Sequence, residues 1–231
     1  MISVIVPSRG RPDELLLSLN SLRLVENGLE ALVWLDNDDP KLDQYQRLLK
    51  SNDQIKVFVK DRVAYKKIHE MQHFLATQAS FDWIFIWNDD ATMTNPDWFA
   101  IFKNFVKDFE PATQPVVINI WGQGITIKNL FPIVSRAYFE ILGHFGLTPT
   151  LDVWVRMVGV EANITYDLNG IKPKHRKDKV PDILIDETFE DVESDRLEFG
   201  GQWDPRHSHL RPLLEADIEK ILRYKKVSFK L

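Results

Sequence analysis

Two adjacent carboxylates follow closely after an apolar run in the first half of the chain. The run covers residues 83–87, and Asn88-Asp89-Asp90 follow it. Like charges at short range repel where water is partly excluded, so this pair needs a partner of opposite charge. A divalent cation would meet that need, and hard oxygen ligands select Mg²⁺ or Mn²⁺. The plainer interpretation is a solvated turn that caps the next helix.

Further polar groups could take part in chemistry at other points of the sequence. Asp36 ends a second apolar run. Asp152 stands where a helix is expected to begin, and from its position alone it would be an ordinary helix N-cap. His175 lies among lysines and arginines, where it is either a surface residue or a metal ligand.

Two weaker candidates come from aromatic and histidine side chains. Trp121, beside a Gly-Gln-Gly segment, is a candidate sugar contact, whereas Trp83 and Trp87 are expected to be core residues. His207 and His209 have a spacing that could bind a metal on a strand. No third ligand is evident, so we interpret both as structural.

The elements that carry these residues alternate between strands and helices. Apolar and β-branched runs predict strands over residues 2–6, 31–35, 55–59, 83–87 and 115–121. Helical spacing predicts helices from residue 13 onward and over residues 41–50, 65–78 and 95–109. This order predicts an α/β fold with a mostly parallel central sheet flanked by helices, which binds ligands beyond the carboxyl ends of its strands.

Composition narrows the class of protein. The chain has 231 residues, 44% of them hydrophobic, which is enough for one sizeable core. A net charge of -5 disfavours broad attraction to nucleic acid or acidic membranes, and the lack of cysteine excludes disulfides and thiolate zinc sites. The first apolar run is too short for a signal peptide or a membrane span, so we expect a soluble, cytoplasmic protein.

The order of these motifs resembles glycosyltransferase family two, whose members have the GT-A fold. The first strand with Pro7-Ser8-Arg9, the strand that ends at Asp36 and the run that ends at Asp90 are similar to its successive nucleotide-binding motifs. Residues 131–136 and 142–145 resemble its acceptor-side strand, helix and turn. Its Glu-Asp motif, with the helix and strand that follow, is similar to residues 151–153 with Arg156, Gly159 and Tyr166.

The resemblance covers residues 1–176 and implies a role for each matching position. Pro7, Ser8 and Arg9 would line the base and ribose of a nucleotide. Asp36 would accept a hydrogen bond from the base, and Arg62 would lie near the base or the diphosphate.

The acidic motif departs from the family pattern. Its first position usually carries an aspartate that faces the ribose, and Asn88 occupies it here. Asp89 would also contact the nucleotide-sugar, and Asp90 would hold Mn²⁺ or Mg²⁺ together with His175. Asp152 would deprotonate an acceptor hydroxyl, which then displaces the diphosphate and inverts the anomeric centre.

The sequence thus predicts an inverting, metal-dependent glycosyltransferase with a nucleotide-diphosphate donor, expected to be a UDP-sugar. The acceptor is an unidentified hydroxyl of a glycan or, in a viral protein, of a modified nucleic-acid base. Short loops suggest a bacterial or bacteriophage source. Two alternatives stay open: a nucleotidyltransferase acting on a sugar phosphate, and a non-catalytic nucleotide- or carbohydrate-binding module.

The predicted domain covers residues 1–205. Residues 1–110 form its nucleotide-sugar half and residues 111–205 its acceptor half, and residues 206–231 follow as a C-terminal tail or helix. A nucleic acid would be a partner only as the acceptor, because the overall charge is acidic. The basic residues between 172 and 179, with Arg206 and Arg211, could supply a local basic rim for it.

Overall fold

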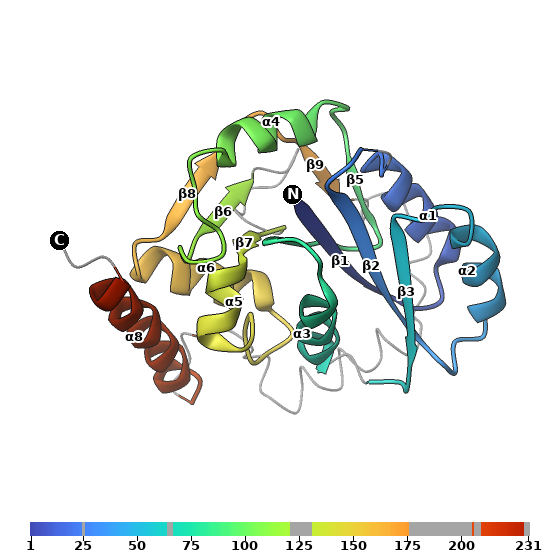
Figure 1. The fold of residues 1–231 in the computed structure, drawn as a ribbon. Helices are drawn as coiled ribbons and strands as arrows, with labels where there is room; N and C mark the ends of the chain where they lie inside the picture. Colours follow the sequence, from blue (N-terminus) through green and yellow to red (C-terminus); the bar gives the residue numbers. More distant parts are fainter. Residues whose placement is uncertain (25, 64–66, 121–130, 176–204, 206–208, 229–231) are drawn as a thin grey trace.

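A seven-stranded sheet with the order β3-β2-β1-β4-β7-β6-β8 organises the chain (Figure 1). The computed structural model describes residues 1–24, 26–63, 67–120, 131–175, 205 and 209–228. The strands of this sheet are β1 (Ile2–Ser8), β2 (Leu29–Asp36), β3 (Ile55–Lys60), β4 (Trp83–Ile86), β6 (Val117–Ile120), β7 (Ile133–Ser135) and β8 (Thr165–Leu168).

The half of this sheet formed by β1, β2, β3 and β4 is parallel. Strand β1 lies between β2 and β4, with Ile2 opposite both Leu29 and Trp83. Strand β3 continues the parallel order beside β2, whereas β7 runs antiparallel to both β4 and β6. Because β1, β2, β3 and β4 run in one direction, their carboxyl ends lie along one edge. That edge carries the acidic groups predicted to bind a ligand.

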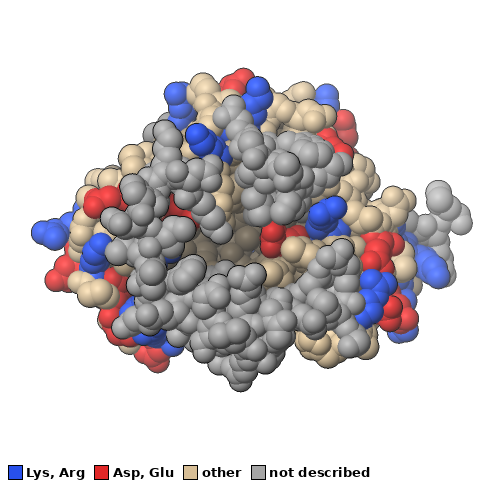
Figure 2. Space-filling model, turned by 180° about the vertical axis from the view of Figure 1, so that it is seen from behind, with Lys and Arg blue, Asp and Glu red and all other residues tan. Residues whose placement is uncertain are grey.

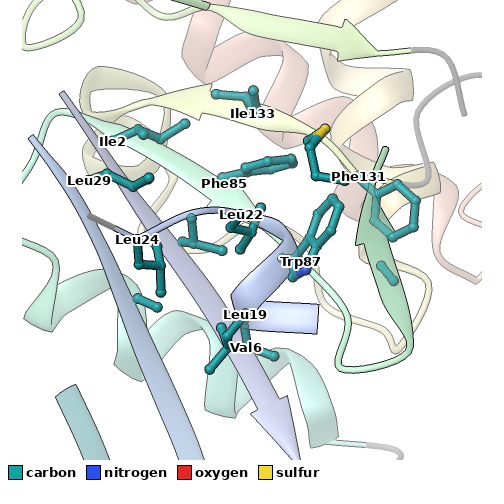
Figure 3. Packing of buried hydrophobic residues seen from close by; sticks show 14 of the residues in the cluster. Ile2, Val6, Leu19, Leu22, Leu24, Leu29, Phe85, Trp87, Phe131 and Ile133 are labelled. Atoms are coloured by element: carbon teal, nitrogen blue, oxygen red, sulfur yellow. The ribbon is translucent and has the colours of Figure 1, made fainter. Parts of the chain in front are cut away.

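Helices cover both faces of the sheet. On one face lie α1 (Pro12–Ser21), α2 (Leu42–Leu49) and α4 (Trp98–Val106). On the other lie α3 (Ile68–Gln78), α5 (Arg136–Leu142), α6 (Leu151–Glu161) and α8 (Arg211–Ser228). Figure 3 shows the first of these two cores, in which Trp87 packs among Leu19, Leu22 and Phe131. The predicted α/β architecture with a mostly parallel sheet is confirmed.

Tryptophans Trp83 and Trp87 lie in the core, as predicted, with 2% and 0% of their surface exposed. The candidate sugar contact Trp121 lies outside the described residues, as does His207, and His209 is exposed. In the described part of the chain, no helix combines the length and the apolar character that crossing a bilayer requires.

A second, two-stranded sheet pairs β5 (Ala91–Met93) with β9 (Pro173–His175) in antiparallel orientation. The sequence predicted neither strand, and the segment from residue 171 was expected to be basic and irregular. Strands of three residues are too short to show a period, and the pairing joins segments far apart in the chain. The register places His175 opposite Ala91, directly after the acidic motif.

Helix α8 lies within residues 206–231, which were predicted to form a tail or a helix, and it packs into the domain. Its residues Leu214, Ile218 and Ile221 are buried in the same core cluster as Trp154 of α6. Its outer face is charged, with Arg211 bridging to Glu161 at 2.9 Å. The division of the chain at residue 205 stays a prediction, whereas the described part of α8 shares the core of the main sheet.

Gly159 allows α6 to approach the sheet closely. A Cβ atom at this position would lie 2.5 Å from Thr165 Oγ1 and 3.1 Å from Val117 Cβ. Overpacking in Gly159→Ala costs about 1–3 kcal/mol, and the better helix propensity of alanine offsets roughly 1 kcal/mol of that cost. Because the Cβ would lie only 2.5 Å from Thr165 Oγ1, we expect the upper part of this range, a net loss of about 1–2 kcal/mol in the free energy of unfolding. Urea unfolding measures the difference.

Val160→Ala is the matched control for this substitution, because its side chain is 58% exposed on the same helix. Its stability should stay within about 0.5 kcal/mol of the parent chain. If Gly159→Ala were as stable as the parent, the contact between α6 and the sheet would be looser than the structure shows.

Candidate functional site

A cavity of about 220 Å³ opens at the carboxyl ends of β1, β2 and β4. A hollow with acidic side chains at its edge is visible near the middle of the face in Figure 2. The cavity combines three arginines, three aspartates and a histidine with a few neutral residues. The described residues that line it are Pro7, Ser8, Arg9, Arg11, Asp36, Arg62, Val63, Ile68, Met71, Asn88, Asp89, Asp90 and His175.

All but one of the predicted site residues therefore meet in one place. The exception is Asp152, a half-buried residue in the first turn of α6 that is not among the described residues lining the cavity. It is not the N-cap of that helix either, since Thr150 holds that position. The plainer interpretation of Asp152 as a cap is wrong, and its role as a base stays a prediction.

Arg9 and Asp36 form an ion pair in the cavity, with 19% and 3% of these side chains exposed. Arg9 Nη1 donates to Asp36 Oδ2 at 3.0 Å, and the Trp34 indole donates to Asp36 Oδ1 at 3.0 Å. Burial raises the pKa of the Asp36 carboxyl, although the hydrogen bonds from Trp34 and Arg9 work in the opposite direction. Asp36 is therefore a hydrogen-bond acceptor in a fixed position, and Arg9 beside it is a donor in a fixed position. A planar base carries donors and acceptors along its edge, so this pair suits it.

Ser8 joins the end of β1 to the acidic motif. Its hydroxyl donates to Asp89 Oδ2 at 2.7 Å and lies 2.8 Å from the Tyr45 hydroxyl. Because the single hydroxyl proton of Ser8 goes to Asp89, Tyr45 donates its own proton to Ser8. The Tyr45 oxygen also accepts a hydrogen bond from the Arg11 backbone N–H at 2.8 Å. One buried phenol from α2 thus holds the loop between β1 and α1, and Ser8 links that loop to the acidic motif.

Asp89 is already engaged by the protein. Besides Ser8, its carboxylate lies 3.8 Å from Arg11 Nη1. Burial raises the pKa of Asp89 to about 6, Arg11 lowers it and the neighbouring Asp90 raises it again. Asp89 is therefore held by Ser8 and Arg11, whereas Asp90 contacts His175.

Asp90 faces His175. Asp90 Oδ1 and His175 Nε2 are 2.8 Å apart, with 14% and 13% of these side chains exposed. Neighbouring ligands of an octahedral Mg²⁺ or Mn²⁺ ion lie about 3 Å apart, so this pair fits two positions of such a shell. No cluster of three or more such side chains suited to a metal occurs among the described residues. A cation here would take its remaining ligands from water and from a substrate.

Four lining residues had no predicted role. Arg11 belongs to the same polar loop as Arg9, and that proximity was a signal available in the sequence. Val63, Ile68 and Met71 form an apolar wall, which comes from the segment after β3 and from α3. Apolar residues on a helix more often pack in the core than contact a ligand, so nothing in the sequence distinguished these three from core residues.

Comparison with known proteins finds solved structures that share this architecture. No protein-family model matches the sequence, and no curated protein matches it. Among solved structures, residues 1–349 of S. aureus TarS align with 99% of this chain and 72% of their own length, at 13% identity and a TM-score of 0.61. The same protein has been solved in complex with UDP-GlcNAc.

A second neighbour is the mannosyltransferase PcManGT from Pyrobaculum calidifontis, solved in complex with GDP-Man and Mn²⁺. It aligns with 100% of this chain and 76% of its own length, at 10% identity and a TM-score of 0.62. The chain therefore has a GT-A-type fold, as its resemblance to glycosyltransferase family two implied. Identity this low establishes the fold alone, and function has to be argued from the site.

Proposed function

We propose that this protein is an inverting, metal-dependent glycosyltransferase that uses a nucleoside diphosphate sugar, expected to be a UDP-sugar, as its donor. The observation that carries the proposal is the cavity itself. In it, Arg9 and Asp36 lie at the ends of β1 and β2, and Asp90 lies with His175 beyond β4. The structural neighbours that bind UDP-GlcNAc and GDP-Man have the same fold, which adds support.

The proposed donor position follows from the chemistry of the lining. The base would lie on the apolar wall of Val63, Ile68 and Met71, with its polar edge toward Asp36 and Arg9. Asn88 would hydrogen-bond a ribose hydroxyl, and Arg11 and Arg62 would face the diphosphate. Asp152 would accept the proton of the acceptor hydroxyl as that oxygen attacks the anomeric carbon.

The charges of the cavity lining leave a need for a bound cation. The three arginines of the described lining are matched by three aspartates, so the protein offers little net positive charge to a diphosphate. Asp90 and His175 would hold Mn²⁺ or Mg²⁺. When bound, such an ion would supply the charge neutralisation that the departing diphosphate needs.

Hydrolysis of UDP-sugars and GDP-sugars with Mn²⁺, and again with a chelator, tests the proposal. A metal-dependent release of nucleoside diphosphate supports the transferase, with water as a slow acceptor. Binding of the nucleotide without any turnover, even with candidate acceptors present, would favour a non-catalytic binding module instead. Release of diphosphate from a nucleoside triphosphate and a sugar phosphate would favour a nucleotidyltransferase.

Asp36→Asn tests the proposed position of the base. Asparagine keeps an acceptor for the Trp34 indole but loses the charge that holds Arg9. We expect the Kd for UDP with Mn²⁺ to rise about tenfold, the loss of roughly 1.4 kcal/mol for a charged hydrogen bond. The Kd for inorganic diphosphate with Mn²⁺ should not change. Isothermal titration calorimetry measures both.

Asp38→Asn serves as the control, because Asp38 also pairs with Arg9 but is half exposed and is not among the described residues that line the cavity. Its Kd for UDP should stay within about twofold of the parent value. An equal loss of affinity for UDP and for inorganic diphosphate in Asp36→Asn would contradict the base assignment.

A further inference from the structure

The C-terminal helix α8 sends one carboxylate into the interior of the protein. Asp217 is only 2% exposed, although its helix is charged on the outer face. Burying a carboxylate costs several kcal/mol unless hydrogen bonds compensate for the lost water, so such a residue normally has a specific task. The cavity described above does not include Asp217.

The partners of Asp217 come from the first turn of α6, from just beyond the end of α5 and from α8 itself. Trp154 Nε1 donates to Asp217 Oδ2 at 3.0 Å, and His144 Nε2 lies 3.4 Å from the same oxygen. Lys220 donates to the other oxygen at 3.3 Å. Burial raises the pKa of Asp217, but the hydrogen bonds from His144 and Trp154 outweigh that effect, and the net pKa is below its usual value. Asp217 is thus held as a charged acceptor.

Trp154 belongs to the first turn of α6, two residues beyond Asp152. Its backbone N–H closes that turn on the Thr150 carbonyl at 3.2 Å, and its ring is completely buried. Gly146 packs directly against it, because a Cβ atom at position 146 would lie 2.8 Å from Trp154 Cβ. The indole therefore fixes both the first turn of α6 and the loop that leads into it.

The same loop is held from the donor side by α3. The Phe145 N–H donates to His73 Nε2 at 3.1 Å. Burial lowers the pKa of His73 to about 3, which leaves the ring neutral and able to accept this bond. Helix α3 also carries Met71 at the cavity wall. The loop between α5 and α6 is therefore clamped between the donor-side helix and the C-terminal helix.

We propose that Asp217 is a positioning residue for the transfer reaction, which fixes the first turn of α6 and thereby the direction of Asp152 through the Trp154 indole. This inference rests on the proposed function and on Asp152 as its base. Helix α8 then has a second role besides covering the core. Its Asp217 fixes the position of the catalytic base Asp152, although Asp217 does not line the donor cavity. A displacement of about 1 Å in a catalytic group can lower turnover about 100-fold.

The test compares Asp217→Ala with Asp217→Asn. Alanine leaves the Trp154 N–H without its acceptor, whereas asparagine still offers one oxygen to it. We expect Asp217→Ala to lower kcat for hydrolysis of the UDP-sugar about 10- to 100-fold and Asp217→Asn to recover most of the loss. Rates are counted per molecule that binds UDP with Mn²⁺, so unfolded protein does not contribute. The Kd for UDP should stay within twofold.

Trp154→Phe offers a second route if the alanine variant folds poorly, because it removes the N–H and keeps most of the ring volume. Its effect on kcat should not add to that of Asp217→Ala, since both break the same hydrogen bond. Glu219→Gln is the matched control on α8. Its side chain is 63% exposed and pairs with Arg223, so kcat should be unchanged.

The outcomes separate the inference from the proposed function. A parent protein that neither binds nor hydrolyses any nucleotide-sugar overturns the function, and the inference with it. Full turnover in Asp152→Asn overturns both the base assignment and the inference. An unchanged kcat in Asp217→Ala, in a preparation where Asp152→Asn is inactive, overturns the inference alone.

Discussion

Asp90→Ala should abolish the metal-dependent step of the reaction while the protein stays folded. We expect turnover with Mn²⁺ to fall about 100-fold or more, because a bound cation stabilises the departing charge by several kcal/mol. The thermal shift that UDP and Mn²⁺ cause together should also disappear. Asp90 and His175 are both partly exposed, so losing their contact costs little stability, and Tm should change by less than about 4 °C.

His175→Ala should reproduce part of this effect, since it removes the second proposed ligand and leaves the first. Asp108→Ala is the control for a lost carboxylate, because Asp108 is exposed beyond α4 and is not among the described cavity residues. Mn²⁺-dependent turnover that persisted in Asp90→Ala would sink the assignment of the metal to this position.

The sequence predicted the edge of the sheet at which the candidate cavity lies, and the physical reason is local. Apolar runs that are buried on both faces have to end where polar residues begin, so Asp36 and Asp90 marked strand ends without any knowledge of the tertiary structure. The parallel order of those strands then brings their ends together. Eight of the nine predicted positions that line the cavity meet there for this reason, and His175 is the ninth.

The groups that the sequence did not reveal depend on contacts between distant segments. The pairing of β5 with β9 brings His175 to Asp90, and only the family resemblance, not the pattern of residues, pointed to it. Asp217 looks like an exposed acid of an amphipathic helix, and its burial follows from how α8 packs on α5 and α6. Tyr45 gave no signal, because a tyrosine in a short helix is usually a core residue.

Asp152→Asn should remove turnover and leave donor binding intact. Asparagine has nearly the same shape as aspartate but cannot take a proton, and general bases contribute about 100- to 10,000-fold to reaction rates. We expect kcat for hydrolysis of the UDP-sugar to fall within that range. The Kd for UDP with Mn²⁺ should be unchanged, because Asp152 is not among the described residues that line the cavity. Calorimetry and a coupled release assay measure the two quantities on the same sample.

The role of Asp152 is shown by whether Asp152→Asn changes kcat alone or changes the Kd for UDP as well. A base that acts only as the acceptor loses its proton changes kcat without changing the affinity for the donor, whereas a residue that binds the donor changes both. Glu140→Gln is the control, because Glu140 is an exposed acid on α5 that lies outside the described cavity lining. If Asp152→Asn weakened UDP binding as strongly as turnover, Asp152 would be a donor ligand. The proton of the acceptor would then have to leave through another group.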